Sequence, residues 1–425
     1  MEILAINPWI TDFAAYDFWL KPYGFLTILS YLTRKNIKIS YLDCLDKKLL
    51  DGTFGRGKFF SQIIEKPPIF KNIPRYFRRY GISLEEFEKN INKANPDFIL
   101  ITSSMTYWYP GIIETVRILK ARFPKTPLIL GGTYATLCFN HAKKTTGCDY
   151  VFKNNSLNDF FNLIGVGLNT RELYSTLPEY SLFYKKLDYA VFRTSWGCPF
   201  NCSFCAIKKL SGPFFRIDPE IILKFIDTHS KQGIKDFILY DDAFLYEPSY
   251  AKEILAGICS LGRNLAFHTP NALHLRFLDL EIARLMKKSG FINPHFGLET
   301  LDSRLQLDWG DKVNKHDLAK AVRYLKQAGF KNGEFSVYLL LGYPKQDLSK
   351  LESDVIFLNS QGARVSLAEF SPTPGTKIFK DYSRKLSDPL LHNNSIFGLF
   401  QEKKLEEFWN IKNYVRQLNK SLSPL

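Results

Sequence analysis

The features that mark exported and membrane-embedded proteins are missing from this sequence. No stretch approaches the roughly 18 consecutive apolar residues that a membrane-spanning helix needs. The amino terminus, Met1-Glu2-Ile3-Leu4, begins like a strand and lacks the basic region and the cleavage site of a signal peptide. Internal repeats and low-complexity tracts are also absent. We therefore expect a cytoplasmic protein without a membrane span.

Cysteine is too unevenly placed for a disulfide scaffold. The chain has seven cysteines, an odd number, and three of them, Cys198, Cys202 and Cys205, fall within eight residues. Since nothing in the sequence indicates export, a metal or redox site in a reducing cytosol explains this group better than disulfides do. Cys259 lies in a helical stretch and is typical of core, and no cysteine follows it.

The composition of the chain argues against disorder, and its length argues against a single very small domain. The chain has 425 residues, of which 45% are hydrophobic and 23% are charged. These are ordinary values for globular proteins, and the length suggests two or three domains.

Positive charge is in excess, with 57 Lys and Arg against 42 Asp and Glu. It concentrates between Arg56 and Arg79, where aromatic residues alternate with basic ones. This composition is typical of a segment that stacks bases and binds phosphates, and equally of a surface helix that packs its aromatics inward. We favour the surface helix, which leaves a nucleic-acid partner as the less favoured alternative.

Residues 1–165 alternate buried apolar strands with helices. Such alternation predicts a doubly wound, Rossmann-like parallel sheet, which binds ligands at the carboxyl ends of its strands. An irregular basic insertion spans residues 46–95 and ends in a helix that begins at the capping box Ser83-x-x-Glu86. The expected strands are Glu2–Asn7, Ile37–Leu42, Phe98–Thr102, Pro127–Leu130 and Tyr150–Phe152, and the expected helices are Gly24–Lys35 and Ile112–Arg122.

Residues 186–375 contain six strand and helix units at regular spacing. This pattern predicts a partial (β/α)6 barrel of the TIM type, with its site at the carboxyl ends of the strands. Residues 376–425 are expected to form a helical extension, with an amphipathic helix over Lys403–Leu418. The expected strands are Ala190–Ser195, Asp236–Tyr240, Leu265–Thr269, Asn293–Leu298, Phe335–Leu341 and Val365–Phe370, and the expected helices are 219–232, 248–261, 279–289, 314–329 and 348–360.

The strongest motif follows the first barrel strand and reads Ser195-Trp-Gly-Cys198-Pro-Phe-Asn-Cys202-Ser-Phe-Cys205. Three thiolates at this spacing on one loop suit three irons of a [4Fe–4S] cluster. A structural zinc ion would need four ligands, usually from paired C-x2-C motifs, and no nearby His completes the set. Because no fourth cysteine follows in this loop, one iron would stay open for a substrate.

At this motif and the strands after it, the sequence resembles the radical S-adenosylmethionine (SAM) superfamily. The resemblance covers roughly residues 188–375 and implies that SAM chelates the open iron and is cleaved to a 5′-deoxyadenosyl radical. It implies that Phe204 lies along the adenine and that Glu299, in Gly297-Leu-Glu299-Thr300, binds the ribose. The other SAM-binding positions that it implies are Asp241, Asp242, Gly342, Pro344 and Pro372.

Each of these positions also has an ordinary structural explanation. Asp241 and Asp242 suit an N-cap pair, and Glu299 suits a surface carboxylate at a strand end. Their succession at the ends of consecutive strands favours one shared cavity. His268, at the end of the third strand, and Asn271, in the loop that follows, are expected to face this cavity as catalytic residues. A hydrogen-bonded histidine at a strand end explains His268 equally well.

The amino-terminal part resembles the cobalamin-binding domain that precedes many radical SAM domains. Gly131 and Gly132 follow a strand, where their small size would let the backbone approach a corrinoid closely. The Asp-x-His-x-x-Gly motif of many such domains is absent, and no His lies between Pro8 and Gly24. Met105, Tyr107 and Trp108 are candidates to cover the lower face of cobalt. The contacts that the resemblance implies are Thr102, Ser103, Ser104, Met105, Gly131, Gly132, Thr133 and Tyr134.

Together these resemblances imply a cobalamin-dependent radical SAM enzyme that methylates an unactivated carbon or another poorly nucleophilic centre. It would need an external one-electron reductant. The sequence does not choose between a peptide, a lipid, a nucleotide and a small metabolite as its substrate. Three alternatives remain: cyclisation or rearrangement without methyl transfer, a non-enzymatic iron–sulfur module, and a two-cluster tRNA methylthiotransferase. The last would use Cys44, Cys138 and Cys148, although its Cys-Gln-Met-Asn-like motif is missing.

Overall fold

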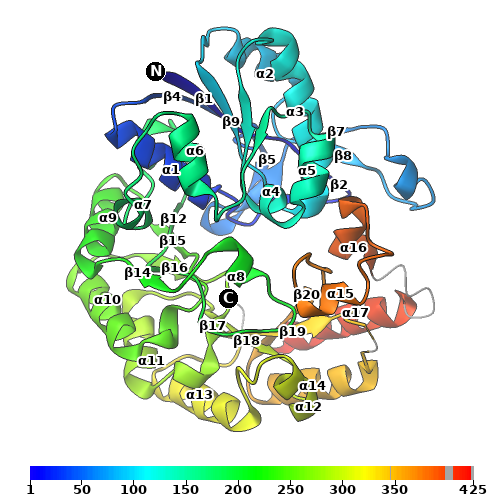
Figure 1. Ribbon diagram of the computed structural model, residues 1–425. Coiled ribbons are helices and arrows are strands. Elements are labelled where there is room, and N and C mark those ends of the chain that lie inside the picture. The colour runs from blue at the N-terminus through cyan, green and yellow to red at the C-terminus, as the bar shows by residue number, and fades with distance from the viewer. Residues whose placement is uncertain (345, 398–404, 423–425) are drawn as a thin grey trace. The chain divides into compact units, whose positions relative to one another are not determined.

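The computed structural model describes residues 1–344, 346–397 and 405–422, and the chain divides into two compact units (Figure 1). The first unit comprises Met1–Asp188 together with Leu386–His392, and the second comprises Tyr189–Lys385 together with Asn393–Leu425. A short stretch near the carboxyl terminus therefore belongs to the amino-terminal unit. Among the described residues, no helix is long and apolar enough to cross a membrane.

A five-stranded, all-parallel sheet forms the centre of the first unit, which confirms the doubly wound fold. The strands lie in the order β11-β10-β9-β1-β4, so the winding changes direction between β1 and β9. Ligands of such sheets bind outside the carboxyl ends of the strands at this switch point. The strands are β1 (Glu2–Asn7), β4 (Lys38–Asp43), β9 (Phe98–Ile101), β10 (Leu128–Leu130) and β11 (Tyr150–Val151).

Helices cover both faces of this sheet (Figure 1). On one face lie α1 (Tyr23–Arg34) and α6 (Leu157–Leu163), whose Tyr31 and Phe161 rings meet edge to face with centroids 5.5 Å apart. The other face carries α2 (Leu84–Ile91), α3 (Tyr109–Arg122) and α5 (Phe139–Thr145). Alternate strand residues point to this second face because side chains along a strand alternate. They form one core that includes Leu4, Ile6, Ile99, Ile101, Leu128, Leu130, Phe87, Ile112 and Val116.

The basic insertion, residues 46–95, contains regular β-strands, so the prediction of an irregular segment is wrong. With the loop after β1 it forms two antiparallel sheets, β2 (Ile10–Asp12), β8 (Arg78–Tyr80) and β7 (Ser61–Ile63), and β3 (Tyr16–Asp17), β6 (Gly57–Phe59) and β5 (Lys48–Asp51). The expected surface helix is absent from this part of the described chain. The expected inward packing of aromatics is present, since Phe59, Phe70, Phe77 and Tyr80 are buried. The capping box at Ser83 and Glu86 is confirmed.

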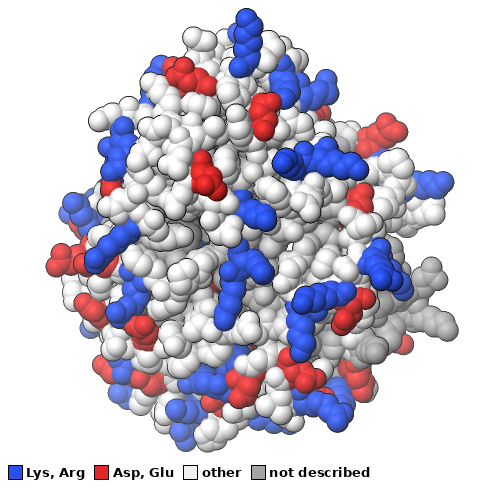
Figure 2. Space-filling view, viewed as in Figure 1, with Lys and Arg blue, Asp and Glu red and all other residues white. Residues whose placement is uncertain are grey.

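Part of the positive charge of the insertion is used internally. Arg79 is buried, pairs with Glu114 at 2.6 Å and lies over the Trp9 ring. Lys48 is paired with Asp188 at 3.0 Å. On the face shown in Figure 2, Lys and Arg side chains are scattered with Asp and Glu between them. The charge on this face is therefore no argument for a nucleic-acid partner.

The second unit is the predicted partial barrel. Two parallel sheets form its wall, β12-β15-β16 and β17-β18-β19-β20. All six predicted strands and five predicted helices are present, and α9 (Pro219–Lys231), α10 (Pro248–Ser260), α11 (Leu280–Ser289), α13 (Lys315–Gln327) and α14 (Leu348–Ser360) follow the strands in turn. The strands are β12 (Ala190–Phe192), β15 (Asp236–Leu239), β16 (Ala266–His268), β17 (Leu273–His274), β18 (His295–Glu299), β19 (Ser336–Leu341) and β20 (Arg364–Glu369).

The residues after β20 are divided between the two units. Leu386–His392 packs against the β9–α3 loop of the first unit, where His392 Nδ1 lies 3.0 Å from Thr106 Oγ1 and the Tyr109 hydroxyl donates to Asp388 at 3.1 Å. The last helix, α17 (Leu405–Ser421), belongs to the second unit. It covers most of the predicted helix over Lys403–Leu418, of which residues 403 and 404 lie outside the described residues.

Candidate functional site

The three predicted cluster cysteines lie on one loop, residues 197–206, between the short strands β13 (Ser195–Trp196) and β14 (Phe215–Arg216). Gly197 opens the loop with a φ of 75°. A Cβ there would lie 2.9 Å from the carbonyl oxygen of Pro213, so a larger residue would push the hairpin apart. Within the loop, the Cys205 amide donates to the Cys202 carbonyl oxygen at 3.1 Å.

Two carboxylates at the end of β15 hold the strand that leads into this loop. Asp241 is buried and accepts hydrogen bonds from the Thr194 amide and hydroxyl and from the Ser195 hydroxyl, at 2.6 to 2.7 Å. Asp242 forms an ion pair with Arg193 at 2.6 Å. These contacts give both carboxylates a supporting role, which the sequence did not predict, and the burial of Asp241 argues against its predicted contact with SAM.

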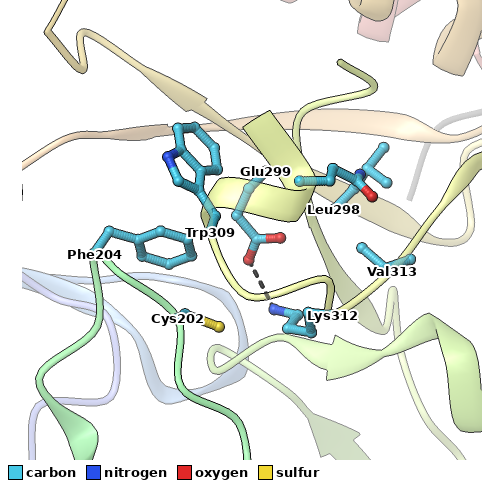
Figure 3. A pocket seen from close by; sticks show the side chains of 8 residues that line it. Cys202, Phe204, Leu298, Glu299, Trp309, Lys312 and Val313 are labelled. Carbon is cyan, nitrogen blue, oxygen red and sulfur yellow. Dashed lines mark hydrogen bonds and ion pairs between the residues drawn. The ribbon is translucent and has the colours of Figure 1, made fainter. Parts of the chain in front are cut away.

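A pocket opens beside the cysteine loop, and two charged side chains meet in it (Figure 3). Glu299 and Lys312 pair at 2.9 Å, and each side chain is only 14% exposed. Glu299 has a φ of 65° and follows an irregularity in the pairing of β18 with β19. Strained backbone of this kind collects at functional sites. The pocket is lined by Cys202, Phe204, Leu298, Glu299, Gln306, Trp309, Lys312 and Val313.

Lys312 is the residue of this pocket that sequence reasoning missed. It lies between α12 (Ser303–Asp308) and α13, and the one available signal was a lysine that follows the carboxylate at the end of β18 in the sequence. Burial lowers the pKa of Lys312, but the Glu299 carboxylate and the thiols of Cys202 and Cys198 outweigh it, so the pKa lies above its usual value. The ammonium therefore remains charged beside the cysteine loop.

Aromatic rings connect the cysteine loop to the end of β19. Phe204 meets Trp309 edge to face at 5.4 Å, and Trp309 meets Tyr343 at 4.8 Å. Gly342 precedes this tyrosine, and its amide donates to Gln346 Oε1 at 2.6 Å. The Ile378 amide, six residues beyond buried Pro372, donates to the Ser203 carbonyl oxygen at 3.3 Å. The structure thus brings Phe204 and the Gly342–Pro344 turn together, and places the segment after Pro372 against the cysteine loop.

The predicted catalytic residues do not lie as expected. His268 is buried, and its Nε2 is 2.8 Å from Asp236 Oδ1. Asp236 begins β15, so this imidazole is directed to the amino end of the strands and away from the cysteine loop. The Asn271 amide donates to the Tyr240 carbonyl oxygen at 2.9 Å. These geometries argue against the catalytic role expected for His268 and give Asn271 a contact that ties two strand ends together.

The predicted cobalamin edge is built around Ser103. Its hydroxyl donates to the Gly131 carbonyl oxygen at 2.6 Å, and its carbonyl oxygen accepts from the Thr133 amide at 2.8 Å. Gly132 has a φ of 93°, and a Cβ there would lie 2.3 Å from the Ser103 carbonyl oxygen. A Cβ on Gly131 would meet nothing within 4 Å. Gly132 is therefore required by the protein itself, whereas the surface at Gly131 is open.

Some of the predicted cobalamin contacts are buried within the protein. Tyr134 has no exposed surface, and its hydroxyl lies 2.7 Å from His141 Nδ1, which argues against a contact of this side chain with cobalamin. Thr102 is also buried, while Ser104 is exposed. Of the three candidates for the lower face, Tyr107 is buried and the Trp108 indole donates to Asp12 at 2.8 Å. Met105 is 45% exposed and is the candidate with a free surface.

Family models match both parts of the chain. The radical SAM superfamily model matches residues 193–358, and the B12-binding domain model matches residues 73–155. The chain contains a radical SAM domain and a B12-binding domain. The two matches confirm the expected cofactors, which are a [4Fe–4S] cluster, SAM and cobalamin.

Relatives of this radical SAM protein include methyltransferases. It is 23% identical over 339 residues to an uncharacterized methyltransferase of Pyrococcus horikoshii, covering 70% of this chain and 72% of that protein. It is 28% identical over 214 residues to the ribosomal protein uS12 methylthiotransferase RimO of Prochlorococcus marinus. That match covers 47% of this chain and 45% of RimO.

Solved structures share the fold of the radical SAM protein. The radical SAM methyltransferase TsrM of Kitasatospora setae, with tryptophan and a SAM analogue bound, has a TM-score of 0.66 at 14% identity, covering 91% of this chain and 76% of TsrM. The cobalamin-dependent enzyme OxsB, with aqua-cobalamin and SAM bound, has a TM-score of 0.58 at 12% identity, covering 92% of this chain and 56% of OxsB. At these identities the likeness shows the fold alone.

The cysteine loop of the radical SAM protein fits a cubane cluster. Among the described residues, no three Cys, His, Asp or Glu side chains gather around the position of a single ion. A cubane binds each thiolate at a different iron, so its cysteines lie farther apart than the ligands of one ion. Burial raises the pKa of Cys202 to about 12, and binding to iron would deprotonate this thiol. The lysine-containing pocket beside it suits the anionic cluster.

The remaining cysteines of the radical SAM protein behave as core residues. Cys44 has no exposed surface, and Cys138 and Cys148 pack against the same core. Burial raises the pKa of all three thiols, to about 11 for Cys148. Inert thiols of this kind are common in protein interiors.

Proposed function

We propose that the protein is a cobalamin-dependent radical SAM methyltransferase that methylates an unactivated carbon or another poorly nucleophilic centre. The observation that carries this proposal is the pairing, on one chain, of an open three-cysteine loop at the mouth of a partial barrel with a B12-binding domain. The methyltransferase relative and the folds of TsrM and OxsB support it.

In this proposal Cys198, Cys202 and Cys205 hold the cluster and leave one iron open for SAM. Once bound, these cofactors would supply an adenosyl radical that removes hydrogen from the substrate and a methyl group carried by cobalamin. Glu299 and Lys312 offer one acceptor and one cation to the polar groups of SAM. Phe204 and Trp309 offer aromatic surface to its adenine.

The B12-binding domain would receive cobalamin at the carboxyl ends of β9 and β10. Ser104 and Met105 are exposed there, and a Cβ on the half-buried Gly131 would meet nothing within 4 Å. No cobalt-ligating histidine lies in the loop after β1, whose residues instead form β2 and β3. We infer that the protein offers no imidazole to the lower face from this loop.

The test uses methyl-labelled SAM and needs no knowledge of the substrate. The full chain, loaded anaerobically with iron, sulfide and hydroxocobalamin and supplied with a one-electron reductant, should form 5′-deoxyadenosine and carry the label in its corrinoid. The Cys198→Ala, Cys202→Ala, Cys205→Ala triple variant is the matched control, which should keep the corrinoid and lose 5′-deoxyadenosine. Formation of 5′-deoxyadenosine with no label in the corrinoid would overturn methyl transfer and favour cyclisation or rearrangement.

A second candidate is methylthiolation, because RimO is among the relatives. It would need a further cluster at Cys44, Cys138 and Cys148, and we propose that these cysteines hold none because they pack in the core. Iron analysis separates the two functions. About four irons per chain support methyl transfer, and about eight, falling to four when the three amino-terminal cysteines become alanine, would support methylthiolation.

A further inference from the structure

His274 is a buried histidine beside the cysteine loop that no part of the proposed function uses. It lies on β17 and pairs in register with Gly297 of β18. Its ring stacks on Phe200, with centroids 4.9 Å apart and planes at 25°. Phe200 stands between Cys198 and Cys202 in the sequence. The imidazole is therefore fixed against the loop that would carry the cluster.

The Nδ1 atom of His274 is fully buried and has no hydrogen-bond partner in the described part of the chain. Only 3% of the residue is exposed, so bulk solvent does not supply the missing partner. Its other ring neighbour is Phe277, with centroids 6.2 Å apart, which offers no acceptor. Buried polar atoms are nearly always hydrogen-bonded, and an orphaned one calls for an explanation such as an absent cofactor.

The charge around His274 indicates what its missing partner is. Burial, followed by the positive charge of Lys312, lowers the pKa of His274 to about 3. An imidazole carries at least one N–H that it can donate. Lys312 also interacts with the thiols of Cys202 and Cys198, so His274, Lys312 and the cysteine loop share one small region. An anionic acceptor there would satisfy the histidine and the lysine together.

We propose that His274 donates a hydrogen bond from Nδ1–H to a sulfur of the cluster that Cys198, Cys202 and Cys205 hold. This inference rests on the proposed function, since it requires the cluster. Hydrogen bonds to cluster sulfurs stabilise the more negative, reduced state and so raise the reduction potential. His274 then sets how readily an external donor reduces the cluster, while Phe200 fixes the orientation of the ring.

The experiment is a redox titration of the reconstituted full chain, followed by electron paramagnetic resonance. His274→Phe keeps an aromatic ring against Phe200 and removes the donor. His274→Asn places an amide N–H at the same distance from Cβ as Nδ1. We expect His274→Phe to bind the wild-type amount of iron at a more negative potential, and His274→Asn to recover part of the shift. His295→Phe, another barrel histidine replaced in the same way, should leave the potential unchanged.

An unchanged potential in iron-loaded His274→Phe would overturn the inference. A second measurement decides the case in which this variant loads no iron. Wild-type protein with 15N-labelled histidine should show, in pulsed resonance spectra of the reduced cluster, coupling to one histidine nitrogen and to a proton that exchanges in deuterated water. Absence of both couplings overturns the inference. Wild-type protein that binds no iron would instead refute the proposed function.

Discussion

At the cysteine loop, side chains provide the ligands and the charge, whereas at the carboxyl edge of the parallel sheet the backbone and small side chains shape the surface. Cys202, Glu299 and Lys312 meet in one pocket because three separate segments present specific groups there. At the carboxyl edge of the parallel sheet, Ser103 forms hydrogen bonds with backbone atoms of Gly131 and Thr133. A site formed by side chains can be recognised in the sequence from a motif of specific residues. A site formed by backbone is marked in the sequence mainly by small residues.

The largest effect is expected at Asp241, which supports the cysteine loop. Asp241→Ala leaves three buried donors on Thr194 and Ser195 without an acceptor. We expect a loss of about 3 kcal/mol in the free energy of unfolding, since each unsatisfied buried group costs about 1 to 3 kcal/mol. Urea denaturation of the cluster-free chain measures it. An unchanged midpoint would show that the loop does not depend on this carboxylate.

The same residue predicts a pH dependence. Burial raises the pKa of Asp241 to about 6 from a usual value of 3.8. Between about pH 4 and about pH 6 the carboxyl of Asp241 stays protonated in the native state and is ionised in the unfolded chain. The contribution of Asp241 to the free energy of unfolding therefore falls as the pH rises through this window. Asp241→Asn should remove this contribution and flatten the dependence of the urea midpoint on pH across that window. The same slope in both proteins would contradict the raised pKa.

Lys312→Met should weaken SAM binding without removing the cluster. It takes away the cation of the pocket and leaves Glu299 without its partner. A hydrogen bond to a charged group contributes about 1.5 to 3 kcal/mol, which corresponds to roughly a tenfold to hundredfold change in affinity. Equilibrium binding of SAM to the iron-loaded chain measures the effect. Lys320→Met, on the neighbouring helix α13, is the control and should bind SAM normally.

The parallel sheet edge is tested by two neighbouring glycines. Gly132→Ala would force a Cβ to within 2.3 Å of the Ser103 carbonyl oxygen at a φ of 93°. Left-handed backbone alone costs an alanine about 1 to 2 kcal/mol, so thermal unfolding should occur at a clearly lower temperature. Gly131→Ala meets nothing within 4 Å and should fold normally. It should lower corrinoid affinity if cobalamin approaches this surface. Equal stability of the two variants would contradict the role given to Gly132.

The smallest effect is expected at the carboxyl-terminal stretch Leu386–His392. His392→Ala removes the contact with Thr106 in the β9–α3 loop, worth about 1 kcal/mol. Because this loop also presents Ser104 and Met105, corrinoid affinity should fall several-fold while the iron content stays the same. Spectroscopic titration with hydroxocobalamin measures it. A loss of iron with unchanged corrinoid affinity would show that His392 acts on the cysteine loop of the second unit, which would contradict its assignment to the first unit.

The contrast between the two sites explains what the sequence predicted well. The five-stranded sheet, the parallel sheets of the barrel, their main helices and the cysteine loop follow from periodicity and from one dense motif, because these depend on residues close in the chain. Lys312 was missed because its pairing with Glu299 depends on a loop between α12 and α13 that has no motif of its own. His268 was misplaced because the end of a strand does not reveal where a long side chain points. The burial of Tyr134 was not foreseen because a residue after a Gly-Gly pair can face the core or the ligand.

The central claim is that cobalamin and one [4Fe–4S] cluster serve one active chain, and co-elution of the corrinoid tests it most directly. The full chain is reconstituted anaerobically with iron, sulfide and hydroxocobalamin, separated from unbound cofactors, and assayed for iron, corrinoid and cleavage of SAM. We predict about four irons and about one corrinoid per chain, with formation of 5′-deoxyadenosine under reduction. A chain that cleaves SAM and carries no corrinoid would contradict the account.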